Sequence, residues 1–171
     1  MQFKCAAAYQ RYSLLLITQN SALCHKIMPN LKEDDNALRQ VLTQAKIIAV
    51  VGHSDKRHRT SYQIAQFLRQ VGYTVYAVNP LVKEIDGKPS YAALEQLPEP
   101  VDIVNVFRRS EYLPEIVDEA IAVNIKTVWA QLGIWHQPSA QKALNAGLNV
   151  VMDACIKIEY LRLKVDLASD V

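Results

Sequence analysis

Basic and hydroxyl side chains follow an apolar run in "AVVGHSDKRHRTSYQIAQFL", residues 49–68. The run ends at Gly52, which lets the chain turn sharply and brings backbone N–H groups close to a bound group. A helical pattern begins at Ser61, so the positive end of a helix dipole faces the same loop. The loop carries three fixed positive charges, at Lys56, Arg57 and Arg59. This combination predicts a phosphate site; the alternative is a helix capped by Thr60 or Ser61 behind a solvated basic loop.

The same stretch differs from a usual dinucleotide site. Such sites show G-x-G-x-x-G after the first strand and an acid at the end of the second. Here Gly52 is the only glycine of the loop, and the second strand ends in Val78, Asn79 and Pro80. The P-loop pattern G-x-x-x-x-G-K-[ST] is also absent from the sequence. NAD is therefore disfavoured, while another nucleotide stays open.

Two later strands are followed by residues suited to a nucleotide. Phe107 in "VFRR" can lie against an adenine, and Arg108 can meet a phosphate. In "WAQLGIWHQP", Gln131 supplies an amide and Gly133 permits close approach of the backbone. The alternative in each case is structural: a core phenylalanine with solvated arginines, and an ordinary glycine turn.

Catalytic and metal-binding signatures are weak. His53, His58, His136 and Cys155 lack the spacing of a recognised metal site, and no local Ser-His-Asp or Cys-His signature stands out. Cys155 follows the last predicted strand and begins a helix, a position that favours thiolate and disulfide exchange. Free cysteine is also a common core residue, so both interpretations of Cys155 stay open. We predict no catalytic residue and no metal.

The elements that must position these residues alternate along the chain. Continuous apolar runs predict five buried strands, "KIIAVVG", "YTVYAVNP", "VDIVNVF", "KTVWAQLG" and "LNVVMDA". Helical periodicity predicts helices over residues 61–71, 110–123, 138–146 and 156–167, and Asp86-Gly87 marks a short edge hairpin. This alternation predicts an α/β fold with a doubly wound parallel sheet, whose ligands bind at the carboxyl ends of the strands.

Composition and charge are those of a soluble globular protein, with 50% apolar and 21% charged residues. The net charge of +2 provides no basic field for nucleic acid, and no membrane partner is expected. Three scattered cysteines fit a reducing, cytoplasmic compartment. Residues 1–30 hold three basic residues and no acid, which suggests a loosely ordered extension or, alternatively, a transit-like presequence. We expect a leading helix over residues 31–44 and one domain over residues 45–167.

Several segments, taken in order, resemble the small single-domain CoA-binding proteins (the YccU-like family), which are similar to the CoA-binding domain of the succinyl-CoA synthetase alpha subunit. They are "IAVVGHSDKRHRTSYQIAQFLRQVGYTVYAVNP", "DGKPSYAALEQLPEPVDIVNVFRR", "EIVDEAI", "KTVWAQLGI" and "AGLNVVMDACIKIEY", and they cover about residues 45–160. The resemblance implies a Rossmann-like CoA-binding domain with strand order 3-2-1-4-5-6. The piece near residues 86–91 would be strand three.

The resemblance also implies which residues meet the ligand. Those implied to hold the CoA phosphates lie in the first loop: Gly52, His53, Ser54, Lys56, Arg57, Arg59 and Ser61. Those implied to flank the adenosine part are Asn79, Pro80, Phe107 and Arg108. Those implied to lie toward pantetheine are Gln131, Gly133 and Ile134. By the fold argument, the pantetheine then runs along the strand ends toward Cys155.

The residues and the resemblance therefore agree on a nucleotide with phosphates that is not a nicotinamide. We predict that the chain binds coenzyme A or an acyl-CoA as a module or carrier without catalysis of its own. The alternative is a nucleotide-dependent enzyme, of the oxidoreductase or ligase type. Its reaction would use polar residues at the strand ends, namely His53, Gln131, His136 and Cys155.

Overall fold

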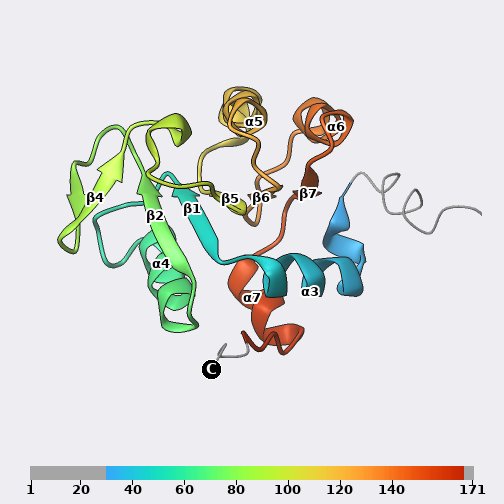
Figure 1. The fold of residues 1–171 in the computed structure, drawn as a ribbon, viewed down its shortest axis with the longest axis horizontal. Coiled ribbons are helices and arrows are strands. Elements are labelled where there is room, and N and C mark those ends of the chain that lie inside the picture. Colours follow the sequence, from blue (N-terminus) through green and yellow to red (C-terminus); the bar gives the residue numbers. More distant parts are fainter. Residues whose placement is uncertain (1–29, 168–171) are drawn as a thin grey trace, which may run out of the picture.

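Seven strands form one sheet, with helices on both faces, in the computed structural model of the chain (Figure 1). The structure describes residues 30–167. The strand order is β3-β4-β2-β1-β5-β6-β7, and every neighbouring pair is parallel except the β3–β4 hairpin at one edge. With β4 counted as strand three, the predicted doubly wound parallel sheet of order 3-2-1-4-5-6 is confirmed.

The strands predicted from apolar runs are short and mostly buried. They are β1 (Ile47–Val51), β2 (Thr74–Val78), β5 (Ile103–Val106), β6 (Thr127–Ala130) and β7 (Asn149–Val151). Helices cover both faces of these strands, which is why their sequences are apolar throughout instead of alternating. β3 (Glu84–Ile85) and β4 (Lys88–Tyr91) form the predicted hairpin, with Asp86 and Gly87 at positive φ in its turn.

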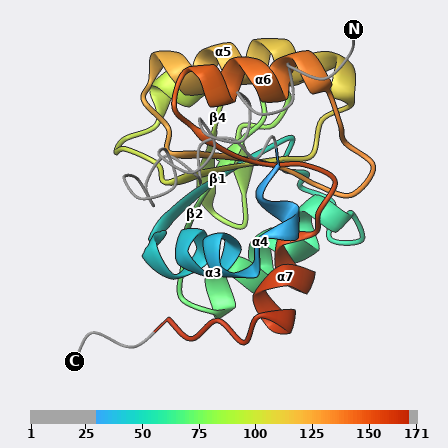
Figure 2. The ribbon, with the colours of Figure 1, turned by 90° about the vertical axis from the view of Figure 1, so that its right-hand side faces the viewer.

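The helices divide into two sets, one on each face of the sheet (Figure 2). On one face lie α3 (Asp35–Gln44), α4 (Thr60–Gln70) and α7 (Ile156–Arg162). On the other lie α5 (Leu113–Ala122) and α6 (Gln137–Asn145). Each set closes its own buried cluster, around Leu68 and Trp129 on the first face and around Val104 and Leu113 on the second. The change of face between α4 and α5 follows from right-handed crossovers on either side of β1.

Short 3₁₀ turns precede two of the predicted helices. Residues Leu31–Glu33 form one ahead of α3, and Ser110–Tyr112 form another ahead of α5. The break before α3 falls at Asp34, whose carboxylate accepts hydrogen bonds from the N–H groups of Asn36 and Ala37. An aspartate in this position caps a helix, so α3 begins at Asp35.

The last helix ends at Arg162 instead of continuing to about Leu167, as the sequence pattern predicted. Lys164 adopts a φ of 49°, and Val165 donates a backbone hydrogen bond of 3.1 Å to Tyr160. This left-handed turn is a common helix terminus, and it returns Val165 to the core, where it is 7% exposed. The apolar residues beyond Arg162 therefore continue the buried face without continuing the helix.

The segment before α3 docks on the outer edge of the sheet at β7. The side-chain amide of Asn30 donates to the carbonyl of Met152 and accepts from its N–H, each at 3.0 Å. Asn30 thus pairs with the backbone as a neighbouring strand would. Lys32 adds an ion pair of 3.0 Å to Asp153. The predicted extension over residues 1–30 lies outside the described residues, apart from Asn30.

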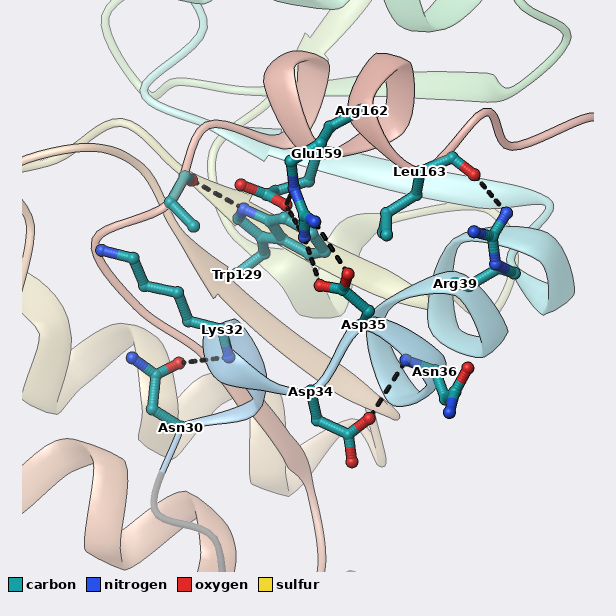
Figure 3. A network of polar contacts seen from close by, with 11 residues as sticks. Asn30, Lys32, Asp34, Asp35, Asn36, Arg39, Trp129, Glu159, Arg162 and Leu163 are labelled. Atoms are coloured by element: carbon teal, nitrogen blue, oxygen red, sulfur yellow. Dashed lines mark hydrogen bonds and ion pairs between the residues drawn. The ribbon is translucent and has the colours of Figure 1, made fainter.

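Charged contacts join α3 to α7 (Figure 3). Both carboxylate oxygens of Asp35 accept hydrogen bonds from Arg162, at 2.9 and 2.5 Å, and Glu159 contacts the same guanidinium. The hydrogen bond from Arg162 holds the pKa of Asp35 below its usual value. The side chain of Arg39 donates to the carbonyl of Leu163 beside this pair. These contacts fix α3 and α7 side by side over the same face of the sheet.

Asp102 joins the amino ends of three strands. One of its carboxylate oxygens accepts from the backbone N–H groups of Lys46 and Ile47, at 2.9 and 3.1 Å, and the other accepts from Lys126 at 2.7 Å. Burial by itself would raise the pKa of Asp102, but these hydrogen bonds outweigh it and hold the pKa below its usual value. The ionised carboxylate therefore stabilises the fold.

We predict that Asp102→Asn lowers the free energy of unfolding by about 1–3 kcal/mol at pH 7, because hydrogen bonds to a charged group are replaced by weaker ones. The folded-state pKa is depressed, so this stabilisation is present above the unfolded value near 3.8 and is lost as the pH falls through the folded pKa. Denaturant unfolding of both proteins from pH 7 to pH 3 measures it. A difference that stays constant over this range would contradict the role of the ionised carboxylate.

Candidate functional site

Gly52 lies where the chain leaves β1, beside the turn that follows β5. Its N–H donates to the carbonyl of Val78 on one side, and Phe107 donates to Val51 on the other, both at 2.8 Å. Gly52 adopts a φ of 84°, and a Cβ there would lie 3.1 Å from Cδ of Arg108 and 3.2 Å from the Phe107 carbonyl oxygen. Only glycine fits this conformation and this approach without strain.

The loop after Gly52 leaves the start of α4 open. Ser54 donates its N–H to the Ser61 hydroxyl at 3.1 Å and accepts at its own hydroxyl from the N–H of Lys56 at 3.1 Å. The predicted capping by Thr60 or Ser61 is wrong, because Arg59 is the N-cap and no side chain within residues 30–167 caps the helix. The Ser61 hydroxyl is instead held by the loop. The first N–H groups of α4 therefore remain available to an anion.

A cleft of about 490 Å³ opens over this helix terminus. Its lining combines residues of the first loop with the ends of β2 and β5: Gly52, Ser54, Lys56, Arg59, Thr60, Ser61, Asn79, Phe107 and Arg108. The lining contains three cationic side chains and no acid. Within the described part of the chain, none of these three cations forms an ion pair. The cleft is thus strongly positive beside an uncapped helix start.

Arg108 separates this cleft from a second, smaller one of about 150 Å³. The guanidinium carbon of Arg108 lies 4.5 Å from the centre of the Tyr112 ring, so the side chain is stacked along the wall between the clefts. The second cleft is lined partly by Pro80 and by two exposed acids of α5, Glu115 and Glu119. The two clefts share Gly52 and Arg108, and together they present cations on one side and carboxylates on the other.

Asn79 and His53 hold the loop from beneath. The Asn79 amide donates to the carbonyl of His53 at 2.8 Å and accepts from the N–H of Leu81 at 3.0 Å. The His53 ring is fully buried, with Nδ1 2.9 Å from the Ser54 carbonyl and its plane edge-on to Tyr62. Burial lowers the pKa of His53, which keeps the ring neutral. His53 therefore shapes the loop and its ring does not line the cleft.

A buried amide pair lies under the strand ends at β5 and β6. Gln131 donates to the side-chain oxygen of Asn105 at 2.7 Å, and both side chains are buried. The side-chain nitrogen of Asn105 has no hydrogen-bond partner among the described residues. Asn105 was not among the predicted site residues, although a polar residue within the apolar run "VDIVNVF" was a visible signal. The pair fixes the start of the loop that follows β6.

That loop is fastened to the edge of the sheet by Asp153. Its carboxylate accepts from the N–H of Gly133 at 2.8 Å, and its own N–H donates to the Ile134 carbonyl at 3.2 Å. The Gly133 hydrogen bond, with help from Lys32, holds the pKa of Asp153 below its usual value. Farther along the loop, the backbone N–H of Trp135 donates to the hydroxyl of Ser110 at 3.0 Å. The strand-end loops after β5, β6 and β7 are therefore tied together.

The four polar residues of the enzymatic alternative have separate partners. His53 bonds Ser54, and Gln131 bonds Asn105. His136 caps α6 through the hydroxyl and N–H of Ser139. Cys155 is the half-buried N-cap of the seven-residue helix α7 and packs against the core. No hydrogen bond joins any two of the four in the described structure.

The structure brings together part of the predicted site. Eight of the predicted residues line the large cleft, namely Gly52, Ser54, Lys56, Arg59, Ser61, Asn79, Phe107 and Arg108. Pro80 lines the adjoining one. Neither lining includes His53, Arg57, Gln131, Gly133, Ile134 or Cys155. Thr60 lines the large cleft but was considered only as a cap.

Comparison with known sequences identifies this architecture. The sequence profile described as "CoA binding domain" matches residues 46–161. The chain belongs to this CoA-binding domain family. The family suggested by the sequence segments is thereby confirmed, over nearly the same residues.

Similar proteins cover different shares of this chain. The uncharacterized protein YneT of Bacillus subtilis is 37% identical over 123 residues, which are 72% of this chain and 91% of YneT. An ADP-forming acetate–CoA ligase of Archaeoglobus fulgidus is 36% identical over 74 residues, 43% of this chain and 11% of the ligase. The solved structure of cell-free ID.343 from Thermus thermophilus has a TM-score of 0.71 and 41% identity, covering 76% of this chain and 98% of that one.

No helix within residues 30–167 is long and apolar enough to cross a membrane. No group of three or more His, Cys, Asp or Glu side chains in this range is placed to hold a metal ion.

We predict that Gly52→Ala destabilises the protein by about 2–4 kcal/mol, because both its φ and the contact with Arg108 become strained. Gly147→Ala is the matched control, since Gly147 has a φ of 87° but nothing within 4 Å of an added Cβ. Its cost should be the backbone term alone, about 1–2 kcal/mol. Denaturant unfolding measures both variants. Equal destabilisation would show that the approach of Arg108 to Gly52 is loose.

Proposed function

We propose that the chain binds coenzyme A, free or acylated, with its phosphates in the cleft over the start of α4. The observation that carries this proposal is the cleft's lining of three cations and no acid beside a helix terminus that no side chain caps. Backbone N–H groups and fixed positive charges are the donors that phosphates need. Membership of the CoA-binding domain family supports CoA as the source of those phosphates.

The adjoining cleft suits the adenosine part of CoA. Pro80 and Tyr112 offer apolar walls, and the carboxylates of Glu115 and Glu119 can accept hydrogen bonds from an adenine amino group or ribose hydroxyls. Arg108, on the wall between the clefts, is then positioned to reach a phosphate. The pantetheine would run from there over the loop at Gly133 toward Cys155.

The same site supports a binding role without catalysis. A reaction at this edge would need an acid, base or nucleophile free to reach the substrate. Of the four polar residues of the enzymatic alternative, His53 and Gln131 are engaged in the interior and His136 caps a helix, so three of the four are not placed for such a role. We therefore regard the chain as a CoA-binding module or carrier. We propose a cytoplasmic location on the ground of its three scattered cysteines alone. Full retention of any measured turnover in His53→Ala and Cys155→Ser would count against the enzymatic alternative built on these residues. Its loss in a folded variant favours that alternative.

Arg59 and Arg57 make a matched pair for testing the phosphate site. Both lie in the same loop and each carries one positive charge, but only Arg59 lines the cleft. Arg59→Ala should weaken CoA binding by about 1.5–3 kcal/mol, roughly tenfold to a hundredfold, through loss of a charge-assisted hydrogen bond. Arg57→Ala should weaken CoA binding less, because only the long-range electrostatic attraction of that charge is lost. Calorimetric titration with CoA measures both, and unchanged affinity in Arg59→Ala would remove the basic loop from the site.

Cys155 provides a separate test of where the thiol end of CoA lies. Attack of the Cys155 thiolate on CoA disulfide would form a protein–CoA disulfide and release one CoA thiol. Intact-mass spectrometry before and after reductant detects this adduct on the folded protein. An adduct at Cys155 supports the proposed path of pantetheine. No adduct, or one at Cys5 or Cys24, leaves Cys155 as a packing residue.

A further inference from the structure

A third cavity, of about 370 Å³, lies beside the β3–β4 hairpin and shares no lining residue with either cleft at Gly52. It exists because β4 pairs with only the last two residues of β2, Ala77 and Val78. In the described chain the first half of β2 has no strand partner on that side. The uncovered half of β2 forms one wall, and Lys88 and Pro89 of the hairpin form the opposite one. A volume of this size is typical of small-molecule sites.

Arg69, from the last turn of α4, provides the charge in this cavity. Within residues 30–167, its buried Nε atom has no hydrogen-bond partner, and its Nη2 makes a long contact of 3.5 Å to the carbonyl of Val75. No carboxylate of these residues lies within ion-pair distance of the guanidinium. Burial lowers the pKa of Arg69 against the opposing effect of Asp86. Arg69 is half-buried and has no ion-pair partner in the described chain, so an incoming anion would stabilise its charge.

The side chains around Arg69 indicate which kind of anion the cavity suits. Asp86, the nearby acid of the hairpin turn, accepts a hydrogen bond of 2.6 Å from Gln66 instead. The lining holds one other cation, Lys88 at the exposed rim, and no acid. The remaining walls are largely aromatic and aliphatic, with Tyr73 and Ile85 buried. A planar guanidinium fork matches a carboxylate, and so few donors would leave a phosphate dianion poorly satisfied.

We propose that this cavity is a second ligand site, in which Arg69 binds the carboxylate of a small organic acid whose apolar body lies between Tyr73 and Ile85. Lys88 attracts the anion from the rim. The site is separate from the clefts around Gly52, so a ligand there neither needs CoA nor displaces it. The proposal therefore stands or fails independently of CoA binding.

Benzoate is a suitable probe, because it combines a carboxylate with an aromatic body. Its titration should move the Arg69 Nε–H signal in a ¹H–¹⁵N spectrum, while chloride at the same ionic strength should not. Lys88→Gln should weaken benzoate binding about twofold to fivefold, as expected for an exposed charge. Lys83→Gln removes the same charge from the same hairpin but outside the cavity lining, and it should leave the affinity unchanged. Arg69→Gln should abolish binding, with thermal melting as the check that the variant is folded.

Three outcomes overturn the proposal. An Arg69 Nε–H signal that responds equally to chloride and benzoate, or to neither, removes the site. Inorganic phosphate that binds at Arg69 more tightly than benzoate rejects the carboxylate assignment. Should Arg69→Gln fail to fold, the comparison of Lys88→Gln with Lys83→Gln still decides, because equal affinities in those two variants would contradict the cavity as the binding place.

Discussion

The close approach between β1 and β5 at their carboxyl ends is the constraint on which the site depends. The chain leaves β1 at Gly52 toward α4 on one face, and it leaves β5 at Phe107 toward α5 on the other. Two backbones that diverge to opposite faces leave a crevice between them. The crevice stays narrow because Gly52 has no side chain to separate it from Arg108. A single glycine thus sets the distance between the basic first loop and the arginine of the second.

The large cleft concentrates positive charge from three cations that form no ion pair within the described chain. Lys56, Arg59 and Arg108 meet around the start of α4, which no side chain of the described residues caps. The starts of α5 and α7 are also uncapped within these residues, so the cations distinguish this helix start from those two. Like charges without acids repel one another, so such a cluster is a cost to the unliganded protein. An anionic ligand relieves this repulsion. The repulsion among the three cations is moderate, because all three side chains remain in contact with solvent.

Much of the fold follows from the sequence, because buried strands and amphipathic helices have distinct periods. The alternation of strands and helices was predictable for that reason, and the Asp86-Gly87 turn signal indicated the edge hairpin. The strand order came from the resemblance to the CoA-binding family and not from the periods. The end of α7 was not predictable from the sequence. An apolar residue such as Val165 can be buried in a helix or in the turn that is found there, so its hydrophobicity does not mark the helix end. Within the site, residue types indicated a phosphate loop. Sequence could not separate Arg59 from Arg57, because their directions depend on the bonds that tie Ser54 to Ser61 and Lys56.

The most direct test of this account is a calorimetric titration of the protein with CoA, acetyl-CoA, NAD and ATP under one set of conditions. A site built around phosphates, with no acid at the end of β2 to hold a nicotinamide nucleotide's ribose, predicts that CoA or acetyl-CoA binds more tightly than NAD and ATP. Binding of NAD in preference to CoA would contradict it.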